Sequence, residues 1–568
     1  MSSEQYPVRT STPEFLEQKK LSWTEHRAPT PERRRAARLI LADVMAGVPV
    51  FAAIRNHPLE GEGGYVGKSF VIAEYRAMVE AGEIVADPAL LEKIRMKPMR
   101  TLSGVTTVTV LTEPYPCPGK CIFCPTDFRM PKSYLADEPG AMRALQHNFD
   151  PYEQVRSRIE SLESIGHPTD KIELLILGGT WSSYRKDYQE WFVLRCFEAM
   201  NGLPADALSG DGPGLRAADR RSALLSAQAA NETAAHRNVG LVVETRPDHV
   251  DPEELAWLRY LGVTKVQMGA QSLDDRILEL NHRGHTVAET LSATALLRAA
   301  GFKIVLHWMP NLLGATPASD LADFGKLWEG FCPDEIKIYP TQLLANAELY
   351  EYWQRGEYHP YSTEELVDLI ADAKTTIPRY CRVNRVVRDI PSTNVVEGNR
   401  RTSLRMDVQD ELRRRSQRCE CVRCREVRGA DISPETLRLE DVTYMAHGAE
   451  EHFISYVTLE DRLAGFLRLS LPSGGGGETG LRDLDGAAIV REVHVYGQSL
   501  PVGVEKEGAA QHIGLGTELL LRAEEIARER GYCRLAVIAA VGTRRYYEAR
   551  GFRRGELYLI KDYGSHPR

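Results

Sequence analysis

Short apolar runs alternate with amphipathic stretches over much of the chain. Continuous apolar runs predict strands that are buried on both faces, at 105–111, 172–177, 239–244, 265–270, 303–308 and 335–339. Helical patterns lie between them, at 139–164, 187–200, 251–261, 286–300 and 317–330. This alternation indicates an α/β fold, a partial (β/α)6 barrel whose functional side chains sit on the loops that follow the strands.

The pattern changes near residue 435. Strand-like runs at 453–458, 463–471 and 488–496 precede a helical stretch at 515–530, and a strand, a short helix and a strand follow at 534–540, 543–550 and 556–561. We therefore expect a second α/β domain over residues 435–568. The other predicted regions are a helical, nucleic-acid-contacting segment over 1–75, the barrel over 76–378 and a linker over 379–434.

Composition and charge refine this picture. The chain has 568 residues and a net charge of -8, which by itself disfavours nucleic acid as a partner. Residues 379–428, however, hold 14 arginines against seven acidic residues, so this segment can attract a polyanion. The alternative is a set of surface salt bridges. Because the sequence has no long apolar run and no signal-like N-terminus, we expect a cytoplasmic protein without membrane contact.

Three cysteines follow the first predicted strand. Cys117, Cys121 and Cys124 are spaced CxxxCxxC, and three thiolates at this spacing can hold three irons of a 4Fe–4S cluster, leaving the fourth open. A structural zinc site is the alternative, but no fourth protein ligand lies nearby in the sequence. The spacing resembles that of the radical S-adenosylmethionine (SAM) enzymes, in which SAM binds the open iron.

Polar residues end the neighbouring predicted strands, where a barrel places its active site. Together with the resemblance to radical SAM enzymes, their positions make them candidates to contact SAM. They are Gly178, Gly179, Thr180, Glu244 and Gln271.

A second cysteine group lies inside the arginine-rich segment. Cys419, Cys421 and Cys424 have the spacing CxCxxC, which suits structural zinc. The fourth ligand is open between Cys381 and Cys332, and we favour Cys381 because it borders the same segment. The alternative is three free thiols.

A glycine-containing motif opens the predicted helix at 515–530. Gln511, Gly514 and Gly516 match the pattern Q-x-x-G-x-G, in which free backbone N–H groups of a helix N-terminus bind a pyrophosphate. The motif, between a strand and a helix, resembles that of the GNAT acetyltransferases. The resemblance implies bound acetyl-CoA, and the residues that we expect around it are Glu492, His494, Val495, Gln511, Gly514, Leu515, Gly516, Thr517 and Tyr547.

The same resemblance suggests the catalytic residues of the second domain. Tyr546 and Tyr547 match the tyrosine that approaches the thioester sulfur in GNAT folds, and His494 is a further candidate. A packing role for one of the two tyrosines is the alternative.

A radical SAM barrel followed by a GNAT domain resembles the Elongator catalytic subunit family, the tRNA uridine acetyltransferases or carboxymethyluridine synthases. The compact CxxxCxxC spacing points to the bacterial or archaeal type. Matching motifs are spread over residues 95–560: KPMRTLSGV (97–105), DEPGAMRA (137–144), FDPYEQVRSR (149–158), ETRPD (244–248), IKIYPT (336–341), RVVRDIP (385–391), CREVRG (424–429), REVHVYG (491–497) and AVGTRRYYEARGF (540–552).

This resemblance implies a reaction. A SAM-derived radical would take hydrogen from the acetyl methyl group of acetyl-CoA, the carbon radical would add to C5 of the wobble uridine, and thioester hydrolysis would leave 5-carboxymethyluridine. Lys171 matches a position that contacts acetyl-CoA from the barrel side. An electron donor is required, and partner subunits of the Elongator type are not. The anticodon stem-loop of the tRNA would contact the N-terminal segment together with Lys97, Arg100, Arg413, Arg414 and Arg415.

Two other functions fit parts of the sequence. A protein lysine acetyltransferase with a structural iron–sulfur cluster would use the GNAT domain alone. A non-catalytic tRNA-binding scaffold would use acetyl-CoA only as a signal.

Overall fold

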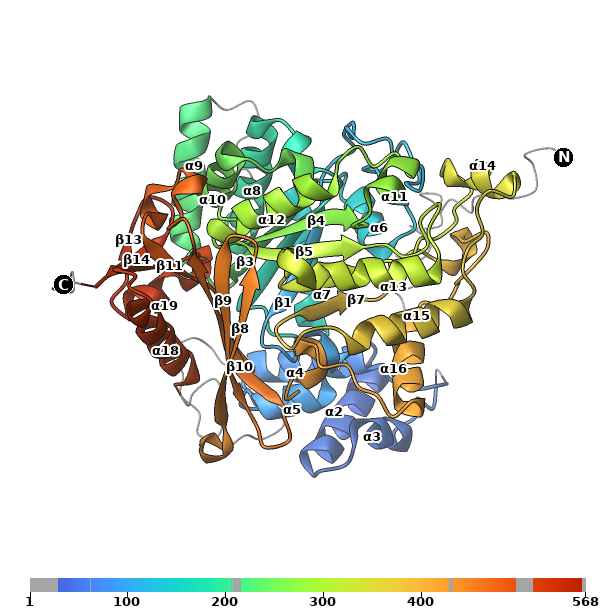
Figure 1. Cartoon of the computed structure of the whole chain (residues 1–568). Helices are drawn as coiled ribbons and strands as arrows, with labels where there is room; N and C mark the ends of the chain where they lie inside the picture. The colour runs from blue at the N-terminus through green and yellow to red at the C-terminus, as the bar shows by residue number, and fades with distance from the viewer. Residues whose placement is uncertain are drawn as a thin grey trace.

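The computed structural model describes residues 29–61, 63–205, 207, 216–428, 433–496 and 514–563 (Figure 1). Its N-terminal part is a helical unit in which Thr30 and Asp87 cap α2 and α5 by accepting hydrogen bonds from backbone N–H groups. The four helices share a small apolar core, which includes Ile40, Phe70 and Ile94. They are α2 (Pro31–Met45), α3 (Val50–Asn56), α4 (Lys68–Glu80) and α5 (Pro88–Ile94).

A seven-stranded parallel sheet follows, with its strands in sequence order from β1 to β7. This arrangement is the partial barrel that the sequence predicts, with one strand more than the expected six. The extra strand, β7, pairs with β6 inside the segment that we expected to be linker. The strands are β1 (Thr106–Leu111), β2 (Lys171–Leu177), β3 (Arg237–Thr245), β4 (Lys265–Gln271), β5 (Lys303–Trp308), β6 (Glu335–Ile338) and β7 (Arg382–Arg385).

Helices connect the strands and cover the outer face of this sheet (Figure 1). Capping boxes, in which Thr286 and Ser362 bond to glutamates at the third helical position, fix where α12 and α15 begin. The helices between β1 and β7 are α6 (Pro139–Gln146), α7 (Pro151–Ser164), α8 (Lys186–Met200), α9 (Ala217–Asn231), α10 (Pro252–Leu261), α11 (Asp275–Leu280), α12 (Val287–Ala299), α13 (Pro317–Lys326), α14 (Leu349–Gln354) and α15 (Thr363–Thr375). Two further helices, α16 (Leu404–Arg414) and α17 (Val422–Arg425), follow β7.

The C-terminal part holds a second, mixed sheet of seven strands in the order β13-β14-β12-β11-β10-β9-β8. Strand β11 pairs antiparallel with β10 and parallel with β12, and α18 lies against β9, β10 and β11. Its elements are β8 (Arg438–Ala446), β9 (Ala449–Val457), β10 (Leu463–Pro472), β11 (Ala487–Val495), α18 (Leu515–Glu529), β12 (Arg534–Val537), α19 (Arg544–Glu548), β13 (Arg553–Arg554) and β14 (Leu559–Asp562).

The two sheets share one apolar core. The buried cluster that contains Leu174 and Ile304 of the barrel also contains Phe453, Phe466 and Ile489 of the second sheet. Polar contacts reinforce this interface: the Tyr558 hydroxyl donates to the Ala300 carbonyl at 2.7 Å. The C-terminal domain is therefore packed against the barrel as part of the same folded body.

No helix in the described part of the chain is both long enough and apolar enough to cross a membrane.

Candidate active site

A cavity of about 1570 Å³ runs along the inside of the barrel and reaches the second sheet. Cys117, Cys121 and Cys124 line it on the side of the cysteine loop, and Gly516 and Tyr546 line it in the C-terminal domain. The barrel strands and strand β11 contribute its walls, so the predicted iron–sulfur site and the predicted acetyl-CoA site open into the same cavity.

Two arginines lie beside the cysteine loop, and their charges favour a thiolate at Cys121. The Arg283 guanidinium donates to the Cys121 sulfur at 3.5 Å. A hydrogen bond from Cys124, followed by the charges of Arg283 and Arg246, lowers the pKa of Cys121 to about 5. Cys117 lies beside Thr180, with 3.9 Å between Sγ and Oγ1. Three thiols, two of them half-buried, beside two arginines fit the anionic thiolate set of an iron–sulfur cluster.

Gly178 and Gly179 form a turn that no other residue fits well. Their φ angles are 136° and 102°, in the region that L side chains rarely adopt. A Cβ on Gly178 would lie 1.8 Å from the Thr112 hydroxyl oxygen. The glycines thus let the backbone after β2 approach Thr112, beside the cysteine loop.

Four buried polar atoms of residues that end or follow the barrel strands have no hydrogen-bond partner among the described residues. They belong to side chains that all line the cavity: Arg246 (Nη1), Gln271 (Oε1), Thr341 (Oγ1) and Gln342 (Oε1). Gln271 also has a left-handed φ of 69°, which is unusual for a residue other than glycine. Unpaired donors and acceptors in a cavity are the complement that a polar ligand such as SAM requires, so the residues present fit this cofactor.

Glu244 lies at the same end of the barrel. The Tyr134 hydroxyl donates to it at 3.4 Å, and His307 Nδ1 lies 3.7 Å away. Burial holds the pKa of His307 well below its usual range, so the imidazole is neutral. A neutral His307 does not form an ion pair with Glu244. Glu244 can therefore accept hydrogen bonds from a ligand.

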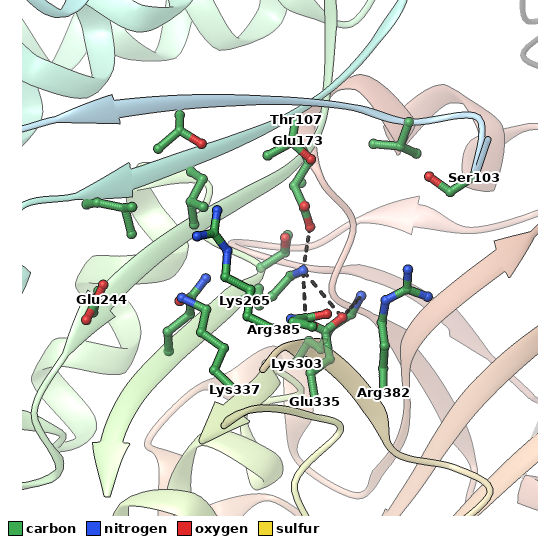
Figure 2. Close-up of a pocket in the computed structure, with 18 of the residues that line it drawn as sticks. Ser103, Thr107, Glu173, Glu244, Lys265, Lys303, Glu335, Lys337, Arg382 and Arg385 are labelled. Carbon is green, nitrogen blue, oxygen red and sulfur yellow. Dashed lines mark hydrogen bonds and ion pairs between the residues drawn. The ribbon is translucent and has the colours of Figure 1, made fainter. Parts of the chain in front are cut away.

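A layer of ion pairs crosses the barrel between the two ends of the cavity (Figure 2). Lys265 lies 2.5 Å from Glu173 and 3.3 Å from Glu335, and Lys303 joins Glu335 at 3.3 Å to Glu492 of β11. Burial opposes the charge of Lys265, but Glu173 and Glu335 raise its pKa above the usual range. The layer is thus ionised at neutral pH and links four barrel strands to the C-terminal sheet.

Gly514 and Gly516 of the predicted acetyl-CoA site line the C-terminal end of the cavity. Gly514 precedes α18 with a φ of 81°, and Gly516 lies so close to Tyr546 that an added Cβ would be 2.6 Å from the Tyr546 hydroxyl. Arg550 stacks on the Tyr546 ring at 3.6 Å and donates to the Thr517 hydroxyl at 3.1 Å. Gln511 lies outside the described residues.

The remaining predicted residues of this domain separate into two groups. His494, Glu492, Val495 and Thr517 line the cavity, whereas Leu515 is 2% exposed and belongs to the apolar core. Burial lowers the pKa of His494 to about 4, and its buried Nε2 has no partner among the described residues. Tyr547 also lines the cavity, but it packs edge-on against Tyr546 and Phe552 within the domain core.

The second cysteine group is compact. The sulfurs of Cys419, Cys421 and Cys424 all lie within 4.8 Å of one another. Cys381 is outside this group, although its carbonyl accepts a hydrogen bond from the Val422 N–H at 2.9 Å. Three converging thiols suit one zinc ion, whose ligands crowd more tightly than those of a four-iron cluster.

The arginines predicted to meet RNA have different surroundings. Arg414 pairs with Glu411 at 2.6 Å, Arg415 pairs with Asp372 at 2.7 Å, and Arg413 pairs with Asp410. None of these three lines the cavity, whereas Arg100 and Lys171 do. Lys97 is exposed next to Arg100. The excess of arginine in the linker is therefore balanced in part by neighbouring carboxylates, some of them from α15.

Three family profiles match the chain. The Radical SAM superfamily covers residues 116–324, the Radical_SAM C-terminal domain covers 333–414, and the acetyltransferase (GNAT) family covers 424–552. The second of these includes β7, in agreement with its place in the barrel sheet.

Curated relatives extend over more than four-fifths of the chain. The tRNA uridine(34) acetyltransferase of Methanocaldococcus jannaschii is 41% identical over 490 residues, 83% of this chain and 87% of that protein. That of Dehalococcoides mccartyi is 41% identical over 470 residues, 81% of this chain and 98% of that protein. The chain belongs to the tRNA uridine(34) acetyltransferase family.

Other members of the tRNA uridine(34) acetyltransferase family agree with this assignment. The Elongator complex protein 3 of Homo sapiens is 35% identical over 492 residues, 83% of this chain and 86% of that protein. The solved structure of the archaeal Methanocaldococcus infernus Elp3 with N-terminus deletion (1-46) superposes with a TM-score of 0.68 at 36% identity, over 81% of this chain and 99% of that one. The chain is thus an acyltransferase with radical SAM and GNAT domains, which imply a 4Fe–4S cluster, SAM and acetyl-CoA.

Several site residues of this family member were missed by the sequence reasoning. Arg283, His307, Lys337, Thr341 and Gln342 line the cavity. His307 and Lys337 lie in predicted strands, Thr341 and Gln342 follow one, and Arg283 lies between a predicted strand and a predicted helix. The IKIYPT motif already pointed to two of them. Their inward orientation became visible only in the folded barrel.

Proposed function

We propose that this enzyme converts the wobble uridine of a tRNA anticodon to 5-carboxymethyluridine, with acetyl-CoA as the source of the added carbon atoms. The observation that supports this most directly is the single cavity that joins the cysteine loop to the acetyltransferase site. A reaction that needs hydrogen abstraction and an acetyl thioester together requires such a shared space.

The barrel residues would hold the redox cofactors. Cys117, Cys121 and Cys124 would ligate the cluster, while Glu244 and Gln271 would accept or donate hydrogen bonds to SAM. When bound, the cluster and SAM supply abstraction of a hydrogen atom. The protein contributes position and shelter from water.

The C-terminal residues would bind and activate the thioester. The N-terminus of α18 faces the cavity through Gly514 and Gly516, where backbone N–H groups can bind the CoA pyrophosphate. Tyr546 would lie near the thioester sulfur, since it contacts both this turn and Arg550. His494 stays neutral and can accept a proton when water hydrolyses the thioester.

The RNA would enter with its base unstacked. A base inside a duplex cannot reach an enclosed site, so a single-stranded anticodon nucleotide is the suitable substrate. We also infer that an external electron donor is needed, that partner subunits are dispensable and that the reaction is cytoplasmic. None of the ten cysteines, all of them in the described ranges, forms a disulfide, as a reducing compartment favours.

The test is anaerobic reconstitution of the full chain with iron and sulfide, followed by reductant, SAM, acetyl-CoA and tRNA. Mass spectrometry of digested tRNA should detect 5-carboxymethyluridine. The Cys121→Ser variant should lose this product but retain acetyl-CoA hydrolysis.

Two outcomes would contradict the proposal. Modified tRNA from the Cys121→Ser variant would exclude the radical reaction. Acetylated lysine on added protein substrates, formed without SAM and with no change in the tRNA, would favour a protein lysine acetyltransferase. The Cys533→Ser variant is the matched control, because Cys533 is exposed and belongs to neither cysteine group.

A further inference from the structure

Three arginines from separate elements meet beside the first barrel strand. Arg100 ends the short helix η1 (Pro98–Arg100), Arg143 lies on α6 and Arg158 lies on α7. Helices α6 and α7 both contact β1, which is an edge strand of the barrel sheet. All three side chains line the large cavity at this edge.

These arginines lack anionic partners. None of the three forms an ion pair with a residue in the described ranges, and Arg143 bonds only to the Pro139 carbonyl, at 2.8 Å. Asp389 is near Arg143, but it pairs with Arg385 at 2.5 Å. Most other arginines in the described ranges lie beside carboxylates, as Arg413, Arg414 and Arg415 do.

The electrostatic consequence is visible in the surrounding groups. Burial, followed by the charges of Arg143 and Arg100, lowers the pKa of Arg158 to about 10. Burial and neighbouring arginines, among them Arg95 and Arg100, lower the pKa of His167 to about 4. Like charges have been brought together here without compensation, which costs stability unless an anion binds.

We propose that Arg100, Arg143 and Arg158 form a binding site for backbone phosphates of the substrate RNA, next to the nucleotide that enters the barrel. This assignment rests on the proposed function. A guanidinium group can donate two parallel hydrogen bonds to the oxygens of one phosphate. Contacts with backbone phosphates fix the position of a nucleic acid without reading its sequence. The site would thus hold the RNA while its base reaches the cavity.

Coenzyme A also carries phosphates, so the ligand must be distinguished. We assign RNA because Gly514 and Gly516 already open a helix N-terminus for the CoA pyrophosphate, on the C-terminal side of the cavity. The three arginines belong to the barrel edge instead.

The experiment measures tRNA affinity against salt concentration for the full chain and for the Arg143→Gln/Arg158→Gln double variant. Two lost phosphate contacts should weaken binding by at least about tenfold at low salt and reduce the slope of log affinity against log salt by about 1.5. The matched control is Arg156→Gln, on the same helix but exposed and paired with Glu153 and Glu160 at 2.7 and 2.6 Å. Its slope should equal that of the unmodified chain.

The KM for acetyl-CoA in thioester hydrolysis separates the two phosphate sources. An unchanged KM with weakened tRNA binding supports the proposal, whereas a raised KM with unchanged tRNA binding would assign the site to CoA and overturn it. The exposed Arg100→Gln variant repeats the test should the double variant fold poorly. If the unmodified chain binds tRNA and both variants bind it with the same affinity, the phosphate site is contradicted but the proposed function is not. If the unmodified chain binds no tRNA, the proposed function is contradicted as well.

Discussion

Single residues of the active site are held in conformations that other side chains tolerate poorly. Gly178 combines a left-handed φ with a very close approach to Thr112, and Gln271 adopts a positive φ although it has a side chain. Strain of this kind persists where the surrounding structure determines it, often next to a ligand. The sequence identified both residues as site candidates from their places after strands, but it held no information on this backbone geometry.

We predict that Gly178→Ala impairs SAM binding. The added Cβ would collide with the Thr112 hydroxyl and approach the Thr112 backbone nitrogen to 3.0 Å, so the turn must shift. Strain of about 1–3 kcal/mol corresponds to a loss of SAM affinity of about 5- to 150-fold, measurable by equilibrium dialysis.

Gly179→Ala is the control for that substitution. It shares the positive φ, but its Cβ would meet nothing nearer than the Lys132 carbonyl at 3.9 Å. Its loss of affinity should be smaller, and equal losses in both variants would show that the collision with Thr112 is not the cause.

His494 should remain neutral over the physiological pH range. Burial lowers its pKa to about 4, so protonation occurs as the pH falls towards that value and not near the usual 6.5. NMR of the chain with nitrogen-labelled histidine, with the signal assigned from His494→Gln, should show neutral ring nitrogens down to about pH 5. A transition near pH 6.5 would mean that water reaches the ring.

Strands of the barrel could be predicted where at least three apolar side chains lie in the core, even when the side chains between them face the cavity. The strands β2, β4 and β5 met this condition and were found close to their expected limits. Strand β7 did not, because its sequence Arg382-Val383-Asn384-Arg385 places polar side chains towards the cavity and only Val383 in the core. A strand that lines a wet cavity has the composition of a loop, so its pattern predicts a linker.

The charged layer between β5, β6 and β11 should contribute strongly to stability. Lys303→Met would leave Glu335 and Glu492 facing each other without the cation that joins them. Breaking a buried pair costs roughly 3–5 kcal/mol. With an unfolding entropy of about 2.1 cal/mol/K per residue, this corresponds to a fall in Tm of about 3–4 °C, which scanning calorimetry can measure.

Arg413→Ala provides the comparison for this layer. Arg413 is exposed on α16 and pairs only with nearby Asp410, so its removal should change stability by less than about 0.5 kcal/mol. If the Tm changes by the same amount in both variants, the buried layer does not stabilise the interface between the two domains.

The short helix α17 and its cysteines should depend on metal. We expect about one zinc per chain by mass spectrometry and its loss in Cys421→Ser, because the three sulfurs converge within 4.8 Å. Iron content after reconstitution should be unchanged, since the cluster cysteines lie elsewhere. Zinc retained in Cys381→Ser would show that the fourth ligand is not Cys381.

On the scale of the whole molecule, the decisive property is that two catalytic units open into one cavity. Motifs for both units could be found in the sequence, because each is local. Their convergence could not, because it depends on contacts such as Arg491 with Asp334 and Arg468 with Asp334 at 3.3 Å, between residues more than a hundred positions apart.

Blocking the middle of the barrel should separate the two half-reactions. Thr109 of β1 lines the cavity, and Thr109→Trp would fill part of it. We expect tRNA modification to fall by more than about tenfold, because the reacting groups can no longer align, while acetyl-CoA hydrolysis and SAM cleavage without tRNA stay within about twofold. Thr109→Ser is the control, and full coupling in Thr109→Trp would mean that the substrates meet by another route.

The apolar core that continues from the barrel into the second sheet limits how this protein can be divided or recombined. An acetyltransferase domain expressed alone would expose the side chains of Phe453, Phe466 and Ile489, which the barrel covers in the intact chain. It would also carry Glu492 without Lys303 and Arg491 without Asp334. A chimera with a foreign GNAT domain would therefore need the side chains of this whole interface as well as the CoA-binding turn. A substitution on one side of the interface would need a compensating substitution on the other side.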